Sequence, residues 1–302
     1  MDQTPPLRRP TSVPEMFGRV RYMMTDAGVQ QALAFEPRQD DVFICPYPKS
    51  GTTWLQQIVH TLRTGGDMDF GEITEVVPWL ELAHDMGLDI HAGQAASPRA
   101  YKSHLPWEMI PKGGRYLLAV RHPADVLVSQ YHFWDGWFFE TGSVTLEDLA
   151  HDFFLQPQVP GSYWAHLLSW WPQRGRDDVL MFCYEDMRAD PGRTVERIAA
   201  FIGIDLDAAL RRRVLEYSSL EFMRAHEAQF DDHLLRETRD AACGIPPGGS
   251  ASKVRKDEVG GGRARLGPAL VAEVEAAWRR EITPVLDLAS YEELRMRLAR
   301  GR

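Results

Sequence analysis

The segment 49–53 combines residue types that hold anions in proteins. It is made of one lysine, one glycine and three hydroxyl residues, namely Lys49, Ser50, Gly51, Thr52 and Thr53. An apolar run at 40–45 precedes it and an amphipathic pattern at 52–66 follows it, which predicts a strand, a loop and a helix. Backbone N–H groups at a helix N-terminus attract negative charge, glycine lets a bulky anion approach, and lysine adds a mobile positive charge. The segment therefore predicts an anion site, with a plain helix cap and an incidental lysine as the alternative.

The order of these residues differs from that of a kinase phosphate loop. Such a loop reads G-x-x-x-x-G-K-[ST], with the lysine after the second glycine, whereas here Lys49 precedes Gly51. The nearest candidate for an acidic Mg²⁺ ligand at the end of an apolar strand is YEDM at 184–187. Binding of ATP with Mg²⁺ is therefore a weakened alternative that stays open.

Three strand-like runs, each followed by a helical pattern, must position this loop. The pairs are 40–45 with 52–66, 114–120 with 121–134, and 177–187 with 188–204. Alternating strands and helices predict an α/β fold, a single domain over 1–302 with a central parallel sheet flanked by helices. Ligands of such sheets bind beyond the carboxyl ends of the strands. The loops at 46–51, 121–123 and 184–187 should therefore converge on one crevice.

The net charge of −9 limits the class of partner. A composition of 44% hydrophobic and 25% charged residues is that of an ordinary globular protein. An acidic surface does not attract polyanions, so nucleic acid is not expected as a partner. An anion site in this chain must create its positive potential locally, from helix N-termini and a few lysine and arginine side chains.

Targeting and redox features favour a cytoplasmic protein. The longest apolar runs, such as 115–120, are too short for a transmembrane segment. The first residues, 1–16, contain several prolines and no apolar core of a signal peptide, which predicts a loosely ordered lead-in. The cysteines are far apart and form no metal-ligand pattern, which indicates reduced thiols and no metal site: Cys45, Cys183 and Cys243. The Gly-, Ser- and Lys/Arg-rich segment 243–263 predicts a flexible loop.

The segment YPKSGTTW at 47–54 resembles the 5′-phosphosulfate loop of the cytosolic-type sulfotransferases. Further segments resemble that family in the same order: YKSHLPWEMIP at 101–111, AVRHPADVLVSQYHFW at 119–134, YEDM at 184–187, SSLEFM at 218–223 and VRKDEVGGGR at 254–263. Together they cover about residues 40–265, which makes the resemblance specific. It implies a P-loop-NTPase-like fold. It also implies 3′-phosphoadenosine 5′-phosphosulfate (PAPS) as donor, 3′-phosphoadenosine 5′-phosphate (PAP) as product, and no metal.

The resemblance implies a donor site built from all of these segments. Residues 49–54 would cradle the 5′ side, Arg121 and Ser129 would hold the 3′-phosphate, and the lid loop 243–263 would close on it. The complete set of cofactor-binding residues is Lys49, Ser50, Gly51, Thr52, Thr53, Trp54, Arg121, Ser129, Tyr184, Ser218, Ser219, Leu220, Arg255, Lys256 and Asp257. Two positions depart from the family pattern, because Leu220 stands where an aromatic is usual and Asp257 where glycine is usual.

The resemblance also implies the catalytic residues. His104 would act as general base toward a hydroxyl or, less commonly, an amine acceptor, since imidazole accepts protons near pH 7. Lys49 would stabilise charge on the leaving phosphate oxygen, and Lys102 would hold the sulfuryl oxygens or the base. Ser129 would restrain Lys49 until the acceptor arrives.

Aromatic residues predict the character of the acceptor. They cluster after the 3′-phosphate segment as Phe133, Trp134, Trp137, Phe138 and Phe139, and Pro78, Trp79 and Leu80 add a second patch. These residues predict a small-molecule or lipid acceptor with an apolar or aromatic body, with core packing as the alternative for each of them. The acceptor's identity and the oligomeric state are left open. A nucleotide kinase and a non-catalytic module that binds adenosine phosphates are the competing functions.

Overall fold

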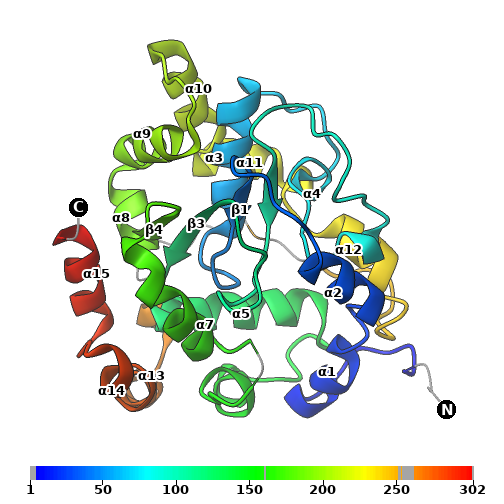
Figure 1. Ribbon diagram of the computed structural model, residues 1–302. Coiled ribbons are helices and arrows are strands. Elements are labelled where there is room, and N and C mark those ends of the chain that lie inside the picture. The colour runs from blue at the N-terminus through cyan, green and yellow to red at the C-terminus, as the bar shows by residue number, and fades with distance from the viewer. Residues whose placement is uncertain (1–4, 160, 251–252, 254–261, 301–302) are drawn as a thin grey trace.

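Four parallel strands form the centre of the computed structural model, which describes residues 5–159, 161–250, 253 and 262–300 (Figure 1). The strands are β1 (Val42–Ile44), β2 (Ala100–Lys102), β3 (Arg115–Val120) and β4 (Val179–Cys183), in the spatial order β2-β1-β3-β4. In the register, Val42 of β1 pairs with Ala100 on one side and with Arg115 on the other. The predicted α/β fold with a parallel sheet is confirmed. Strand β2, only three residues long, was not among the strands that the sequence predicted.

Helices cover both faces of the sheet, because side chains alternate along each strand. Val42 and Ile44 of β1 face a core cluster shared with α3 (Thr52–Thr64), α9 (Pro191–Ile202) and α10 (Ala208–Tyr217). Phe43, between them in sequence, belongs to the opposite cluster, which includes α5 (Pro123–Trp137), α7 (Tyr163–Trp170) and α13 (Pro268–Glu281). The strands are buried from both sides, as their continuous apolar runs predict.

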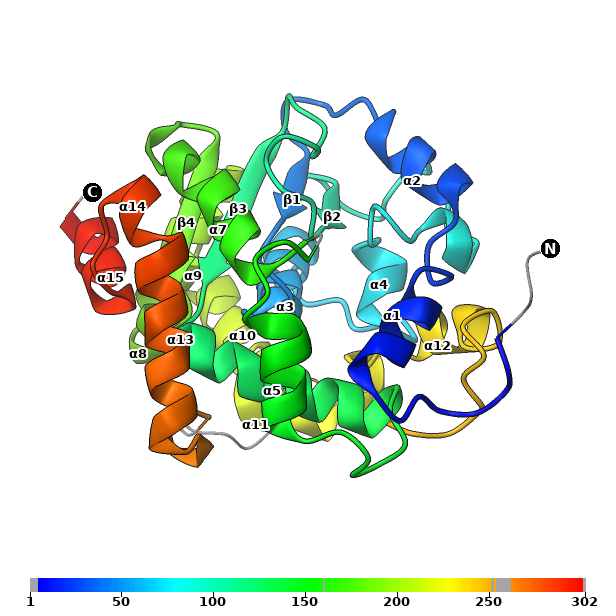
Figure 2. The same ribbon diagram turned by 90° about the horizontal axis from the view of Figure 1, so that it is seen from below.

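The remaining helices close the edges of this core. In both views the C-terminal helices lie on the β4 side, whereas α1 and α2 lie on the β2 side (Figures 1 and 2). Their bounds are α1 (Val13–Val20), α2 (Asp26–Leu33), α4 (Ile73–Val76), α6 (Leu146–Leu149), α8 (Tyr184–Ala189), α11 (Leu220–Ala225), α12 (His233–Arg239), α14 (Thr283–Leu286) and α15 (Tyr291–Arg300). Among the described residues, no helix combines the length and the apolar composition that a membrane crossing requires.

Three of the predicted boundaries differ from the structure as follows. The third strand ends at Cys183, and YEDM begins α8, so the segment 184–187 is helical and not part of the strand. The pattern at 188–204 is divided at Asp190, because its side chain accepts a hydrogen bond from Arg193 N (2.9 Å) and Pro191 starts α9. At the other end of the chain, residues 13–16 of the predicted lead-in already belong to α1.

Candidate active site

The loop between β1 and α3 has a backbone that a glycine makes possible. Gly51 has φ +99° and Lys49 has φ +66°, both in the left-handed region. A Cβ at Gly51 would lie 2.9 Å from Cδ2 of Tyr184, so both the backbone conformation and the neighbouring ring disfavour a side chain at this position. Gly51 supplies no side-chain cap to α3. The first N–H groups of this helix therefore lack a capping side chain and are suited to an anionic ligand.

Buried polar atoms gather at the same helix end. The hydroxyls of Ser50 and Thr52 and the indole nitrogen of Trp54 are buried and have no hydrogen-bond partner among the described residues. Such atoms nearly always find partners in folded proteins. Ser50 also lines an enclosed cavity of about 10 Å³ together with His166, whose Nε2 has no partner in the described chain either; the cavity is about the size of one water molecule. The hydroxyls of Ser50 and Thr52 therefore fit an anion, a water molecule or both.

Arg121 joins the loop to the end of β3. Its Nη1 donates to the backbone oxygen of Lys49 (3.0 Å), and its guanidinium lies 4.6 Å from the ring centre of Tyr184. The hydroxyl of Tyr163 donates to the backbone oxygen of Arg121 (2.8 Å). The three segments predicted to converge do meet here. Ser129 lies on α5 about two turns further on and is partly buried.

A buried carboxylate, which the sequence did not single out for this role, fixes the turn after Arg121. Glu185 accepts a hydrogen bond from His122 N (3.1 Å) through one oxygen and from the Tyr291 hydroxyl through the other. The same hydroxyl lies 3.0 Å from the backbone oxygen of Val120. Of the two acids in YEDM, the segment that the sequence offered as a Mg²⁺ candidate, Glu185 is therefore occupied in holding the strand end, and Asp186 pairs with Arg295.

Two lysines from separate segments lie against aromatic rings. Nζ of Lys49 is 4.2 Å from the ring centre of Phe133, and Nζ of Lys102 is 3.4 Å from that of Trp79. Burial, with a contribution from neighbouring cations, lowers the pKa of Lys49 to about 7, and burial likewise lowers the pKa of Lys102 to about 7. Both amino groups can therefore change between the charged and the neutral form near neutral pH.

Asp232 is the acidic partner of these lysines. It forms an ion pair with Lys253 and lies 3.9 Å from Nζ of Lys102. Burial favours the neutral acid, but the charges of Lys253 and Lys102 outweigh it and lower the pKa of Asp232 to about 2. Sequence reasoning missed this residue, because its partners lie far away along the chain.

His104 is held in the tautomer that a base requires. Its Nδ1 lies 2.6 Å from the backbone oxygen of Pro46, which can only accept, so Nδ1 carries the proton and Nε2 keeps its lone pair. Its backbone N–H donates to Glu81 (2.7 Å), and its ring packs against Trp79 with centroids 5.1 Å apart. Burial, with help from Lys102, holds the pKa of His104 well below its usual range, so the imidazole is neutral at pH 7.

The residues predicted around the adenine base are only partly brought together. The rings of Trp54 and Tyr184 meet edge to face at 5.9 Å. The hydroxyl of Ser218 donates to Val214 O (2.6 Å) within its own helix. That of Ser219 accepts from Phe222 N at the start of α11, and Leu220 is exposed. Arg255, Lys256 and Asp257 lie outside the described residues, together with the rest of 251–252 and 254–261 of the predicted lid.

The predicted aromatic patch divides into two parts. Trp137, Phe138 and Phe139 are fully buried, so the packing alternative holds for them. Phe133 and Trp134 are partly buried, and Phe133 carries Lys49 on its face. Trp79 lies between Lys102 and His104. Among the described residues of these two patches, Phe133 and Trp79 are therefore the aromatic residues that contact the candidate catalytic side chains.

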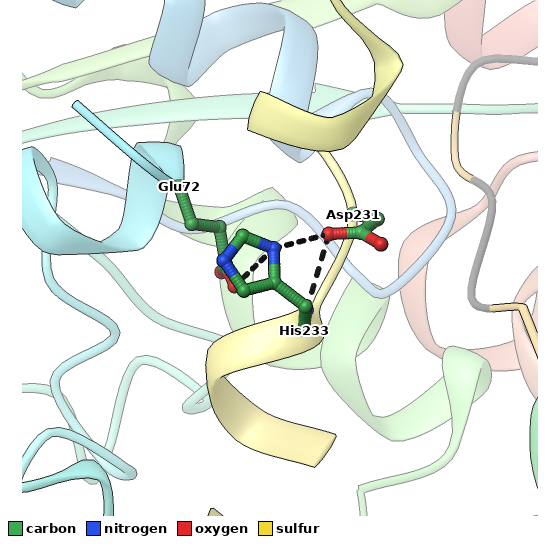
Figure 3. A group of neighbouring side chains, drawn as sticks. All are labelled: Glu72, Asp231 and His233. Atoms are coloured by element: carbon green, nitrogen blue, oxygen red, sulfur yellow. Dashed lines mark hydrogen bonds and ion pairs between the residues drawn. The ribbon is translucent and has the colours of Figure 1, made fainter. Parts of the chain in front are cut away.

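A second group of polar side chains, Glu72, Asp231 and His233, has the residue types of a metal site (Figure 3). Asp231 bonds Nδ1 of His233 (2.7 Å) through one oxygen and Arg236 (2.9 Å) through the other. Burial disfavours the charged imidazole, but these carboxylates outweigh it and raise the pKa of His233. The ligand atoms thus already hold a proton and an arginine, so the group is not arranged for a cation.

Comparison with known proteins places these features in context. The family model described as a sulfotransferase domain matches residues 39–294. The chain is 30% identical over 235 residues to Sulfotransferase 1C2 of Rattus norvegicus, covering 74% of this chain and 79% of that protein. It is 33% identical over 201 residues to Sulfotransferase 2A1 of Homo sapiens, covering 64% of this chain and 70% of that protein.

Two solved structures have the same fold. A mouse sulfotransferase, SULT7A1, complexed with PAP matches with a TM-score of 0.65 and 23% identity, covering 86% of this chain and 90% of that one. A retinol dehydratase in complex with androsterone and PAP matches with a TM-score of 0.67 and 21% identity, covering 87% of both chains.

Proposed function

The chain belongs to the sulfotransferase family, and from this premise we propose that it moves a sulfuryl group from PAPS to a hydroxyl or, less commonly, an amine acceptor, with His104 as general base. The observation that carries the proposal is the convergence of three features. They are the uncapped N-terminus of α3, the Arg121 side chain on the loop backbone, and a neutral imidazole at position 104. An anion site and a base thus occur in one place.

The donor site follows from the geometry of the loop. The N–H groups of α3 with Lys49 suit the 5′-phosphosulfate, and Arg121 with Ser129 suits the 3′-phosphate, because a guanidinium matches paired phosphate oxygens. Trp54 and Tyr184 offer aromatic surface for the adenine ring. The fold shared with two proteins crystallised with PAP supports this assignment.

PAPS supplies the sulfuryl group, whose bond to the 5′-phosphate oxygen breaks as the acceptor oxygen bonds to sulfur. Nε2 of His104 takes the acceptor's proton, since Nδ1 is already committed to Pro46 O. Lys49 stabilises the negative charge that develops on the phosphate oxygen as it receives the electron pair of the broken bond, and Lys102 contacts the sulfuryl oxygens. The lysines supply the positive charge, so no metal ion is required by this scheme.

The acceptor side supports an apolar or aromatic alcohol. Phe133 and Trp79 flank the two lysines, and Trp79 also packs on His104. The retinol dehydratase of the same fold binds androsterone in its crystal structure. We propose a small-molecule or lipid acceptor of this kind, and a cytoplasmic location for the enzyme.

Thermal unfolding with PAP or ATP–Mg²⁺ tests the donor. At 100 times its dissociation constant, PAP should stabilise the fold by about 2.7 kcal/mol, which is about 4 °C for a chain of this size. A shift with ATP–Mg²⁺ and none with PAP would refute the proposal in favour of a kinase. A panel of phenols, steroid alcohols, fatty alcohols and sugars with labelled PAPS then identifies the acceptor.

The variant His104→Ala tests the base. It should lose turnover by about 100-fold or more while its PAP shift stays within about 1 °C of the original. Loss of PAP binding instead would place His104 in the donor site and remove it from the role of base.

A further inference from the structure

Asp232 is a buried acid in the N-cap position of α12 that does not cap its helix. It is only 3% exposed. Aspartate in this position normally accepts a hydrogen bond from the first turn, which stabilises the helix. The carboxylate bonds Lys253 instead and lies 3.9 Å from Lys102. The Asp232 side chain therefore contacts two lysines that are distant in sequence and makes no hydrogen bond to the first turn of its own helix.

Within the described part of the chain, Lys102 has Asp232 as its ion-pair partner. Its side chain is 4% exposed, and its only other close polar or aromatic contact described is the Trp79 ring at 3.4 Å. An ammonium in such a place loses its water and favours the neutral amine unless a carboxylate offsets the loss. Asp232 is that carboxylate.

Other charges around Lys102 act in both directions. Glu72 and Glu81 favour its charged form together with Asp232, whereas Lys253 disfavours it. Lys49 and His104 lie close enough for their own protonation to depend on Lys102. Among the three acidic groups, Asp232 makes the largest contribution and has direct ion-pair geometry.

We propose that Asp232 is a positioning residue that favours the charged form of Lys102 along the Trp79 ring and so increases the fraction of the enzyme in which an ammonium meets the sulfuryl oxygens. The proposal rests on the sulfuryl transfer proposed above. Trp79 sets the position of Lys102 relative to His104, because the same ring packs on both side chains. Asp232 thus acts on the reaction through Lys102 and touches neither donor nor acceptor.

The neighbouring acid provides a matched control. Asp231 faces His233 and Arg236 and has no described ion pair with a lysine. The variants Asp232→Asn and Asp231→Asn therefore make the same chemical change one residue apart. The protonation of Lys102 is followed through its ¹³Cε NMR signal between pH 5 and 10, assigned by its loss in Lys102→Arg.

In Asp232→Asn the Lys102 titration should move to lower pH by about one unit, since removal of a facing carboxylate disfavours the cation. The kcat at pH 7.5, with the hydroxyl acceptor from the panel, should fall about tenfold or more, with the KM for PAPS within about threefold. Asp231→Asn should leave both unchanged. An unchanged Lys102 titration and kcat in a folded Asp232→Asn protein, or equal effects in both variants, would overturn the proposal.

A variant that should shift the Lys102 titration in the opposite direction keeps the test decisive if Asp232→Asn does not fold. Lys253→Met leaves Asp232 to Lys102 alone and removes a repelling cation, so the Lys102 titration should move to higher pH. A downward shift or none would refute the role of Asp232. Because PAP binding of the wild type is measured separately, failure of this inference is distinguishable from failure of the sulfotransferase proposal.

Discussion

Binding of PAP should take up protons above pH 7, because its phosphate meets a lysine that burial has already partly discharged. Lys49 has a pKa of about 7 in the free protein. At pH 7.5 such a group is about three-quarters neutral, and a bound dianion stabilises the charged form, so its pKa rises on binding. PAP binding should therefore take up about 0.75 proton at Lys49. The dissociation constant should rise about tenfold per pH unit well above 7 and be flat in this respect below it.

Titration calorimetry measures this uptake directly. Binding enthalpies at pH 7.5 are compared in HEPES, MOPS and Tris at equal chloride concentration, and the slope against buffer ionisation enthalpy gives the number of protons. The phosphates of PAP, with second pKa values near 6, should release only about 0.1 proton at this pH. Any uptake beyond 0.75 would be assigned to Lys102, whose pKa is also about 7.

The variant Lys49→Met identifies the group. It should bind PAP more weakly at pH 7 and lose about 0.75 proton of the uptake, because no titratable group remains at this position. Uptake below about 0.1 proton in the wild type, or the same uptake in the variant, would refute the assignment of a partly neutral Lys49 to the phosphate site.

Substitutions at three further positions separate the contribution of the backbone from that of charge. Gly51→Ala should lower the free energy of unfolding by about 1–3 kcal/mol in urea and abolish the PAP thermal shift, since φ is +99° and Tyr184 lies 2.9 Å from the new Cβ; a fully retained shift would contradict this. Lys49→Gly should be more stable than Lys49→Ala by about 0.5–1 kcal/mol, because only alanine is strained at φ +66°, and both should be inactive. Arg121→Ala should weaken PAP about 10- to 100-fold and leave the weaker binding of adenosine 5′-monophosphate unchanged, as measured by calorimetry; equal losses for both nucleotides would place Arg121 elsewhere.

The fold and the anion loop could be predicted because their signals are local. A strand, a glycine-containing turn and a helix follow one another within 40–66, and each is encoded by neighbouring residues. The parallel sheet follows from repetition of this unit. Strand β2 escaped prediction because its three residues, which end in a lysine, form no apolar run like that of β1, and because it pairs with β1 across 58 positions of the chain (Val42 with Ala100).

The supporting side chains of the site could not be predicted, because their partners are distant in sequence. Glu185 acts on the backbone after β3 and is held by Tyr291 at the far end of the chain. Asp232 follows another aspartate, and only the fold decides which of the two faces lysines. The aromatic run 133–139 has a helical period that does not distinguish Phe133 beside Lys49 from Trp137 in the core.

An acidic protein that binds a dianion needs local positive charge, and this site supplies it in two chemically different ways. The guanidinium of Arg121 suits a phosphate through paired hydrogen bonds. Burial leaves Lys49 and Lys102 only partly charged near neutral pH, and a nearby anion or carboxylate favours their charged forms. Donor affinity should therefore draw on Arg121 as well as on Lys49, whereas transfer should depend on the protonation of both lysines. Asp232→Asn should change the rate of transfer and leave donor affinity unchanged, and that separation is the strongest physical test of how this site is built.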